Sequence, residues 1–327
     1  MSELRLLKKI PTWVQYLMVA GVIWVLPILL SGSAYWKGIL VVIAMNIMLA
    51  MSLNLILGYT GQLNLGHSAF FGVGAYATTL LIKKAGFTFW MAALSGSFLA
   101  GAVGIFLAFF ATRLKGHYLA IASMAFAIIL HQILLNWDSM TSGPLGIYGI
   151  PAPTPINLFG TEIKFNNNVN YFYLVATVTM ITYIILGNLL RSPIGDTLRA
   201  IREDEVSAAS LGINAKLWKI FAFGIGAFIA GLAGAFYPSF VGTLVPDAFA
   251  VVESFTYLAM VIVGGMGTMF GPIIGAIVLT TLPELLRSLG DARLLVYGVS
   301  LTLVVLFMPG GILQAFQAIK DKLFKSH

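Results

Sequence analysis

Residues 191–219 read RSPIGDTLRAIREDEVSAASLGINAKLWK and form the one long, densely charged segment between apolar stretches. They hold nine charged residues, in a chain with 19 basic and 12 acidic residues. Pro193 would end the preceding helix or start the next one, and Gly212 followed by Asn214 is a helix stop signal. Between these points apolar residues recur at mostly helical intervals. The pattern predicts one or two short amphipathic helices lying along a membrane face.

The composition on either side of this segment indicates a membrane protein. The chain is 59% hydrophobic and 9% charged, with a mean hydropathy of +0.94, whereas soluble domains carry about 25% charged residues. No soluble core could bury so much apolar surface, so we expect an all-α, polytopic membrane protein. The absence of cysteine excludes disulfides, thiolate metal sites and a cysteine nucleophile.

Apolar runs long enough for helices predict about ten transmembrane helices in one domain over residues 1–327. The first run is longer than the apolar core of a signal peptide, which favours a retained span. Residues 63–82 and 251–268 are rich in glycine and are candidates for broken or re-entrant spans. The predicted spans are 13–30, 39–57, 63–82, 88–111, 117–135, 171–190, 220–241, 251–268, 270–289 and 294–309.

The distribution of Lys and Arg predicts the orientation. With the N-terminus inside, inner segments carry thirteen of these residues and outer segments carry six. Since cytoplasmic loops are enriched in Lys and Arg, both termini and the charged segment 191–219 are predicted to be cytoplasmic. The same rule accounts for the net charge of +7 better than nucleic-acid binding does. The longest outer loop, about 136–170, is rich in Pro and Asn and predicts an ordered cap or a short surface helix.

Polar residues gather among glycines between positions 54 and 76. Glycine lets helices pack closely, so the glycines by themselves need no other role. Buried amides in a membrane find partners or face a pathway, so the polar residues are candidates for a translocation path. No second His or carboxylate stands at ligand spacing, which argues against a metal site. The candidates are Asn54, Gln62, Asn64, His67, Ser68 and Tyr76.

Three carboxylates, Asp247, Glu253 and Glu284, fall near the predicted outer ends of spans. Acidic residues in spans are functional candidates, and proton coupling is one use of them. The glycine-rich stretch 264–272 is not a phosphate-binding loop, because no Gly-Lys pair occurs in the chain. It predicts a tight turn.

The charged segment resembles the cytoplasmic coupling loop, the so-called EAA loop, of bacterial ABC importer permeases. Glu205-Val-Ser-Ala208-Ala209-Ser-Leu-Gly212 is a loose form of its pattern. Further motifs resemble, in order, the high-affinity branched-chain amino acid permease family, and in particular the longer of its two paired permease subunits. They are Leu53 to Tyr76, Gly116 to Ile121, Asn136-Trp137 with Thr141 to Ile147, Leu198 to Asp204, Ala230 to Ala235, Val263 to Thr268 and Phe307 to Ile312.

The resemblance implies a permease subunit that carries branched-chain amino acids (Leu, Ile or Val) through the bacterial inner membrane. Its partners would be a sister permease, two ATPase subunits and an extracytoplasmic binding protein. ATP and Mg would bind the ATPases, so this chain would hold no cofactor and would not be an enzyme. Of its coupling residues, Arg199, Arg202, Glu203 and Asp204 would make polar contacts with an ATPase, and Ala208, Leu211 and Gly212 would pack into a groove on it.

Two other functions stay open at this point. A permease for urea or short amides shares the glycine-rich signature. An ion-driven secondary transporter fits the composition, but it would need coupling groups at mid-membrane. A membrane enzyme is disfavoured, because no nucleophile, base and orienting group occur together.

Overall fold

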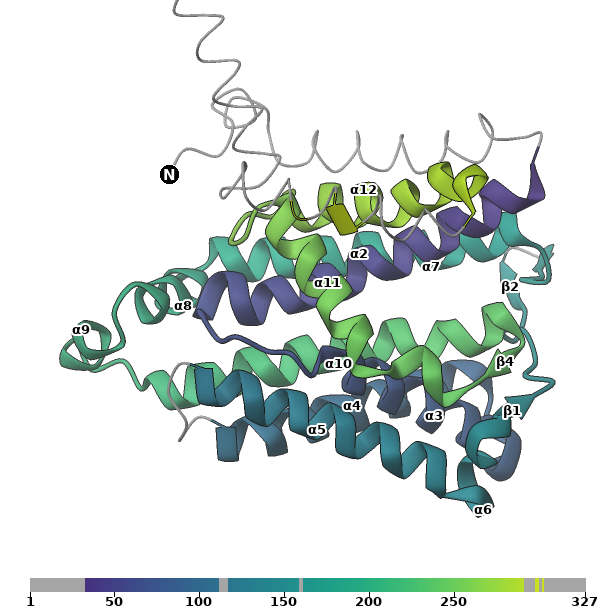
Figure 1. Cartoon of the computed structure of the whole chain (residues 1–327), viewed down its shortest axis with the longest axis horizontal. Coiled ribbons are helices and arrows are strands. Elements are labelled where there is room, and N and C mark those ends of the chain that lie inside the picture. The colour runs from purple at the N-terminus through teal and green to yellow at the C-terminus, as the bar shows by residue number, and fades with distance from the viewer. Residues whose placement is uncertain (1–32, 112–116, 159–160, 291–297, 300–301, 303–327) are drawn as a thin grey trace, which may run out of the picture.

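The computed structural model describes residues 33–111, 117–158, 161–290, 298–299 and 302. Its long helices run roughly side by side, with α8 and α9 at one end of the bundle and the short strands at the other (Figure 1). The helices are α2 (Ala34–Thr60), α3 (His67–Ala85), α4 (Phe89–Ala111), α5 (His117–Asn136), α6 (Asp138–Thr141), α7 (Asn168–Arg191), α8 (Pro193–Glu203), α9 (Glu205–Ser210), α10 (Ala215–Val241), α11 (Val251–Gly264) and α12 (Gly271–Leu285), with 3-10 turns η2 (Gly143–Leu145), η3 (Pro246–Phe249) and η4 (Leu286–Leu289).

Helices α2 and α10 form the centre of the bundle. In their most apolar stretches 78% and 67% of residues are buried, against 28% in α5, which lies at the periphery. Helix α10 packs on α3, α4 and α2. The α3–α10 contact depends on glycine, because a Cβ on Gly74 would overlap the Gly231 carbonyl oxygen. Small residues at such a crossing let two backbones approach closely.

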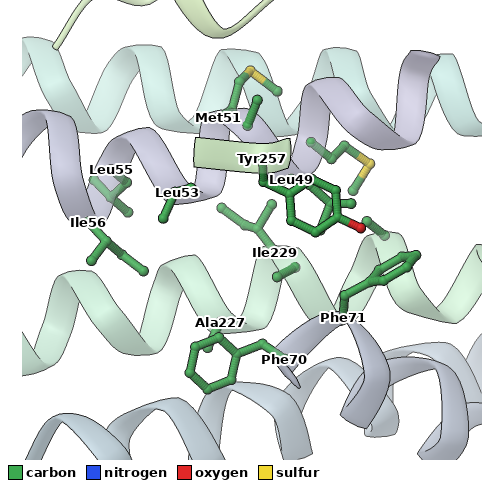
Figure 2. Packing of buried hydrophobic residues seen from close by; sticks show 14 of the residues in the cluster. Leu49, Met51, Leu53, Leu55, Ile56, Phe70, Phe71, Ala227, Ile229 and Tyr257 are labelled. Carbon is green, nitrogen blue, oxygen red and sulfur yellow. The ribbon is translucent and has the colours of Figure 1, made fainter. Parts of the chain in front are cut away.

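The largest hydrophobic cluster joins these central helices. Figure 2 shows Leu49 and Met51 of α2, Phe71 of α3, Ile229 of α10 and Tyr257 of α11 in this cluster. The cluster brings α11 against α2 and α3, although α11 begins at Val251, well over a hundred residues after α3 ends at Ala85.

Eight of the predicted spans correspond to helices in the described part of the chain. The protein is therefore a multi-pass, all-α membrane protein. Among the described residues, five helices are long and apolar enough to cross a membrane: α2, α4, α5, α7 and α10. The predicted spans 13–30 and 294–309 fall wholly or mostly outside the described residues, so the total of about ten is untested.

The two glycine-rich spans are irregular at different points, as their composition suggested. Residues 62–65 are not helical, and α3 begins only at His67. Helix α11 has 14 residues, which gives a length of about 21 Å against a hydrocarbon thickness of about 30 Å. The chain then turns at 265–270 and returns as α12, which packs against α11 and α2.

The end of the bundle opposite α8 and α9 carries two small strand pairs that the sequence did not predict. β1 (Ile147–Tyr148) pairs antiparallel with β4 (Thr243–Leu244), and β2 (Ile156–Leu158) pairs with β3 (Thr161–Ile163). The predicted short helix in this loop is present as α6, and η2 follows it. The β1–β4 pair holds the loop between α5 and α7 against the end of α10.

Candidate functional site: the α8–α9 segment and the polar residues beneath it

The charged segment folds as the two predicted short helices. Ser192 caps α8 by accepting a hydrogen bond from the Ile194 amide, and Pro193 takes the first helical position, where its missing N–H costs nothing. At the far end, Gly212 has φ +82°, a left-handed conformation that favours glycine. The Asn214 side chain then caps α10 through the Leu217 amide.

Asp204 separates the two helices and caps the second. Its carboxylate accepts hydrogen bonds from the Ser207 backbone amide at 3.1 Å and the Val206 amide at 2.8 Å. Hydrogen bonds from the Ser207 amide, the Ser207 hydroxyl and the Val206 amide lower the pKa of Asp204 below its ordinary value. The Asp204 carboxylate, predicted to contact a partner, thus caps α9 through Oδ1 in this structure, and its partner contact is untested.

Two arginines of α8 turn inward and anchor the segment to the bundle. Arg199 donates to the Asp196 carboxylate at 2.8 Å and to the Leu190 carbonyl at 2.9 Å, and it lies over the Tyr59 ring. The Arg202 guanidinium donates to the carbonyl of Gly58, near the end of α2. The predicted partner contacts of both arginines are untested, but in this structure the guanidinium groups contact the chain itself.

The outward surface of the segment is partly apolar. Val206 and Leu211 are each 80% exposed, and Glu203 and Gly212 are also exposed. Ala208 instead packs inward with Ile201 and Ala215 and is 2% exposed. Of the three residues predicted to enter a partner's groove, Leu211 and Gly212 are thus on the surface and Ala208 supports them from beneath. Figure 1 shows α9 projecting beyond the ends of the long helices.

His67 lies in a hydrogen-bonded network where α3 begins. Its Nε2 is 2.7 Å from the Ser52 hydroxyl, and its Nδ1 is 3.3 Å from the Asn64 amide nitrogen. The Ser52 hydroxyl donates to the Leu49 carbonyl, so it accepts from the His67 Nε2–H, and Nδ1 accepts from Asn64. The Asn64 oxygen accepts from the Gly66 amide. These groups are buried and partnered, and they stabilise the break between α2 and α3.

Asn54 performs a similar function for the turn between α11 and α12. Its amide donates to the Thr268 carbonyl and its oxygen accepts from the Gly267 amide, both at 2.9 Å. Arg202 reaches the same place, because a Cβ added to Gly267 would collide with its guanidinium. The sequence identified Asn54, Arg202 and the glycine turn separately; nothing in their spacing indicated that they meet.

The remaining candidates differ in how well they are satisfied. Ser68 and Ser254 are joined by a 2.8 Å hydroxyl hydrogen bond, and Ser254 also accepts from the Ser68 amide. Gln62 accepts from the Thr60 hydroxyl, but its Nε2 has no hydrogen-bond partner within the described residues. The buried Tyr76 hydroxyl likewise has none there. Of the six residues predicted to line a path, Gln62 and Tyr76 are thus the two with a buried polar atom that has no partner in the described residues; the path itself is untested.

A metal site would require several ligating side chains close together. In the part of the chain that the structure describes, no group of three or more His, Asp or Glu side chains could hold an ion.

Comparison with known proteins identifies the family. Residues 35–308 match the family described as branched-chain amino acid transport system / permease component. The chain is 34% identical over 265 residues to the high-affinity branched-chain amino acid transport system permease protein LivM of Escherichia coli (strain K12), covering 76% of this chain and 62% of that protein. It is 25% identical to the probable branched-chain amino acid transport permease protein LivM of Methanocaldococcus jannaschii, over 68% of this chain and 67% of the relative.

A more distant similarity reaches the permease protein LivH of Escherichia coli (strain K12), which is 30% identical over 57% of this chain and 62% of its own length. The chain thus spans somewhat less than two thirds of the Escherichia coli LivM that it matches. No solved structure matches it. The extent of the family match, over most of the chain, shows that this protein belongs to the permease components of branched-chain amino acid transport systems.

Proposed function

We propose that this chain is the membrane subunit of an ATP-driven importer that carries branched-chain amino acids into the cytoplasm. It would pair with a sister permease similar to LivH, with two ATPase subunits on the cytoplasmic side and a binding protein on the outer side. It lies in the inner membrane with both termini and the α8–α9 segment in the cytoplasm. ATP and Mg bind to the ATPases, and this chain does no ATP chemistry.

The exposed apolar surface of the α8–α9 segment is the observation that carries the proposal. Most of the outward surface of this segment is charged or polar, so water alone would require no apolar side chains there. Val206 and Leu211 nevertheless project outward, and each is 80% exposed. Exposed apolar side chains on an ordered, projecting element are typical of a docking surface. In the importer they enter the ATPase groove, while Arg199 and Arg202 hold the segment to the bundle.

Arg202 also provides a route for the mechanical signal. Its guanidinium joins α8 to the end of α2, and Asn54 joins α2 to the turn between α11 and α12. Movement of α8 by the ATPase would therefore reach the short helix α11 through direct contacts. Two packed arrangements of these helices would give outward and inward access.

The test combines composition with transport. The complex is extracted gently from its native membrane, its subunits are identified by mass spectrometry, and it is reconstituted with its binding protein for uptake of labelled leucine, urea and a short amide. Two ATPases, a sister permease and ATP-dependent leucine uptake are expected. Uptake of urea or the amide in place of leucine would overturn the substrate assignment, and active uptake by the chain alone would overturn the ATP-driven mechanism.

A further inference from the structure

Two carboxylates lie on the segment that leads into α11. Asp247 is in η3 and Glu253 is in the first turn of α11. Within the described residues neither forms an ion pair with Lys or Arg, and an Asp247 carboxylate oxygen lies 3.4 Å from the His131 Nε2. The Asp247 side chain is 87% exposed. An exposed carboxylate without a Lys or Arg partner can bind a cation, and acidic groups in or next to membrane spans are candidates for function.

The position of these carboxylates is near the end of the bundle opposite α8 and α9. His131 lies five residues before the end of α5, which places it about 7.5 Å from that end. The β1–β4 strand pair lies at this end of the bundle, and β4 directly precedes η3 (Figure 1). In the orientation proposed above, this is the side on which a binding protein delivers its cargo.

Tyr76 lies on α3, which packs against η3, the turn that carries Asp247. Tyr76 of α3 is 3% exposed, its hydroxyl has no hydrogen-bond partner in the described part of the chain, and it interacts electrostatically with Asp247. Its ring packs on Phe249, two residues after Asp247, with centroids 5.7 Å apart. Such buried groups are usually satisfied by protein or by ordered water, so the Tyr76 hydroxyl is available to a polar ligand; it shares this property with other atoms of the described residues, among them Gln62 Nε2.

Glu253, in the first turn of α11, also has tyrosines near it. It interacts electrostatically with Tyr237 and Tyr257, and the rings of Tyr237 and Phe249 lie 5.9 Å apart. Beside it, Val252 and Phe255 are exposed apolar side chains of α11. The segment thus offers carboxylates, phenols and apolar surface within one short stretch.

We propose that Asp247, with Tyr76 and Glu253 beside it, forms an outer recognition site for the primary ammonium group of the transported zwitterion. This inference rests on the proposed function. A carboxylate pairs with an ammonium through charge-assisted hydrogen bonds, the Tyr76 hydroxyl completes its coordination, and Val252 and Phe255 contact the apolar side chain. A metal ion is disfavoured, because the described residues include no group of three ligands.

The experiment uses the assembled transporter with its binding protein in proteoliposomes and follows labelled leucine. Asp247→Asn removes the charge and keeps the shape, while Asp247→Glu keeps the charge. Glu162→Gln is the matched control, because Glu162 is an exposed carboxylate on the strand pair at the same end and is paired with Lys164. We expect Asp247→Asn to lower uptake about tenfold to a hundredfold, as loss of a charged hydrogen bond does. Asp247→Glu should retain most of the uptake and Glu162→Gln all of it.

Cysteine chemistry provides a second, charge-specific measurement. Because the chain has no cysteine, Asp247→Cys introduces a single thiol into it. Attachment of a sulfonatoethyl group should restore uptake, and a trimethylammonium-ethyl group should not. Wild-type uptake by Asp247→Asn, or equal losses in Asp247→Asn and Asp247→Glu, would overturn the inference while leaving the proposed function standing. A wild-type complex that carries urea instead of leucine would overturn both.

Discussion

Arg202→Met distinguishes two functions for the arginine. If Arg202 contacts the ATPase, as the resemblance alone implied, its loss weakens docking. In the structure its guanidinium donates instead to the Gly58 carbonyl and lies beside Gly267. Its Cγ would lie 3.3 Å from a Cβ on Gly61, so the stem packs along the end of α2. Methionine keeps this packing and removes only the charged group.

The structure sets the size of the expected effect. A hydrogen bond from a charged donor is worth about 1.5–3 kcal/mol. The bond to Gly58 is partly buried and Arg202 as a whole is exposed, so the lower end applies, about 1.5 kcal/mol. That corresponds to about a tenfold weakening of the link between α8 and the helices beneath it.

The assay is the number of leucine molecules transported per ATP hydrolysed by the reconstituted complex. We expect Arg202→Met to co-purify with both ATPases and to hydrolyse ATP, but to transport about tenfold less per ATP. Lys216→Met is the matched control. It removes a positive charge from the same segment, but Lys216 lies over the Phe109 ring of α4, so the ratio should be unchanged.

Two results would refute the reasoning. An unchanged transport ratio in Arg202→Met would show that the contact with Gly58 transmits nothing. Loss of the ATPases from the purified variant would show that Arg202 is a docking residue.

Three further outcomes are expected. Gly74→Ala should lower the free energy of unfolding of the purified protein by about 1–3 kcal/mol, because the new methyl group would overlap the backbone of Gly231. The same change at Gly38, where the nearest atom would be 3.4 Å away, should be neutral or stabilising by up to about 1 kcal/mol; equal melting shifts would contradict this. Leu211→Glu should abolish co-purification of the ATPases without changing the melting temperature, since the side chain is 80% exposed. The pKa of Asp204 is lowered in the folded chain. The ionised carboxylate therefore stabilises α9 fully at pH values above the ordinary Asp pKa near 4, and this stabilisation is lost as the pH falls through the lowered pKa. Hydrogen exchange at the start of α9 should accelerate there, and in Asp204→Asn the exchange should not show this acid step.

Local chemistry was enough to predict the helices and the ends of the α8–α9 segment. Pro193 restricts its own backbone and lacks an N–H, and Gly212 accepts a left-handed conformation, so each position acts on its immediate neighbours. Composition likewise determined the membrane class, because the apolar fraction of the chain exceeds what any soluble core can bury. The glycine-rich spans were recognised as irregular for the same local reason.

The tertiary structure alone decided which of the polar residues are used within the protein. Asn54 and Gly267 are 213 residues apart and meet only because α11 packs on α2. From the sequence, Arg202 was predicted to contact a partner protein, yet it donates a hydrogen bond to the carbonyl of Gly58, 144 residues away. His67 is satisfied by Ser52 and Asn64, whereas the hydroxyl of Tyr76, on the same helix, has no partner among the residues that the structure describes. Whether a polar group finds a partner depends on groups brought close by packing, and sequence spacing carries no record of those distances.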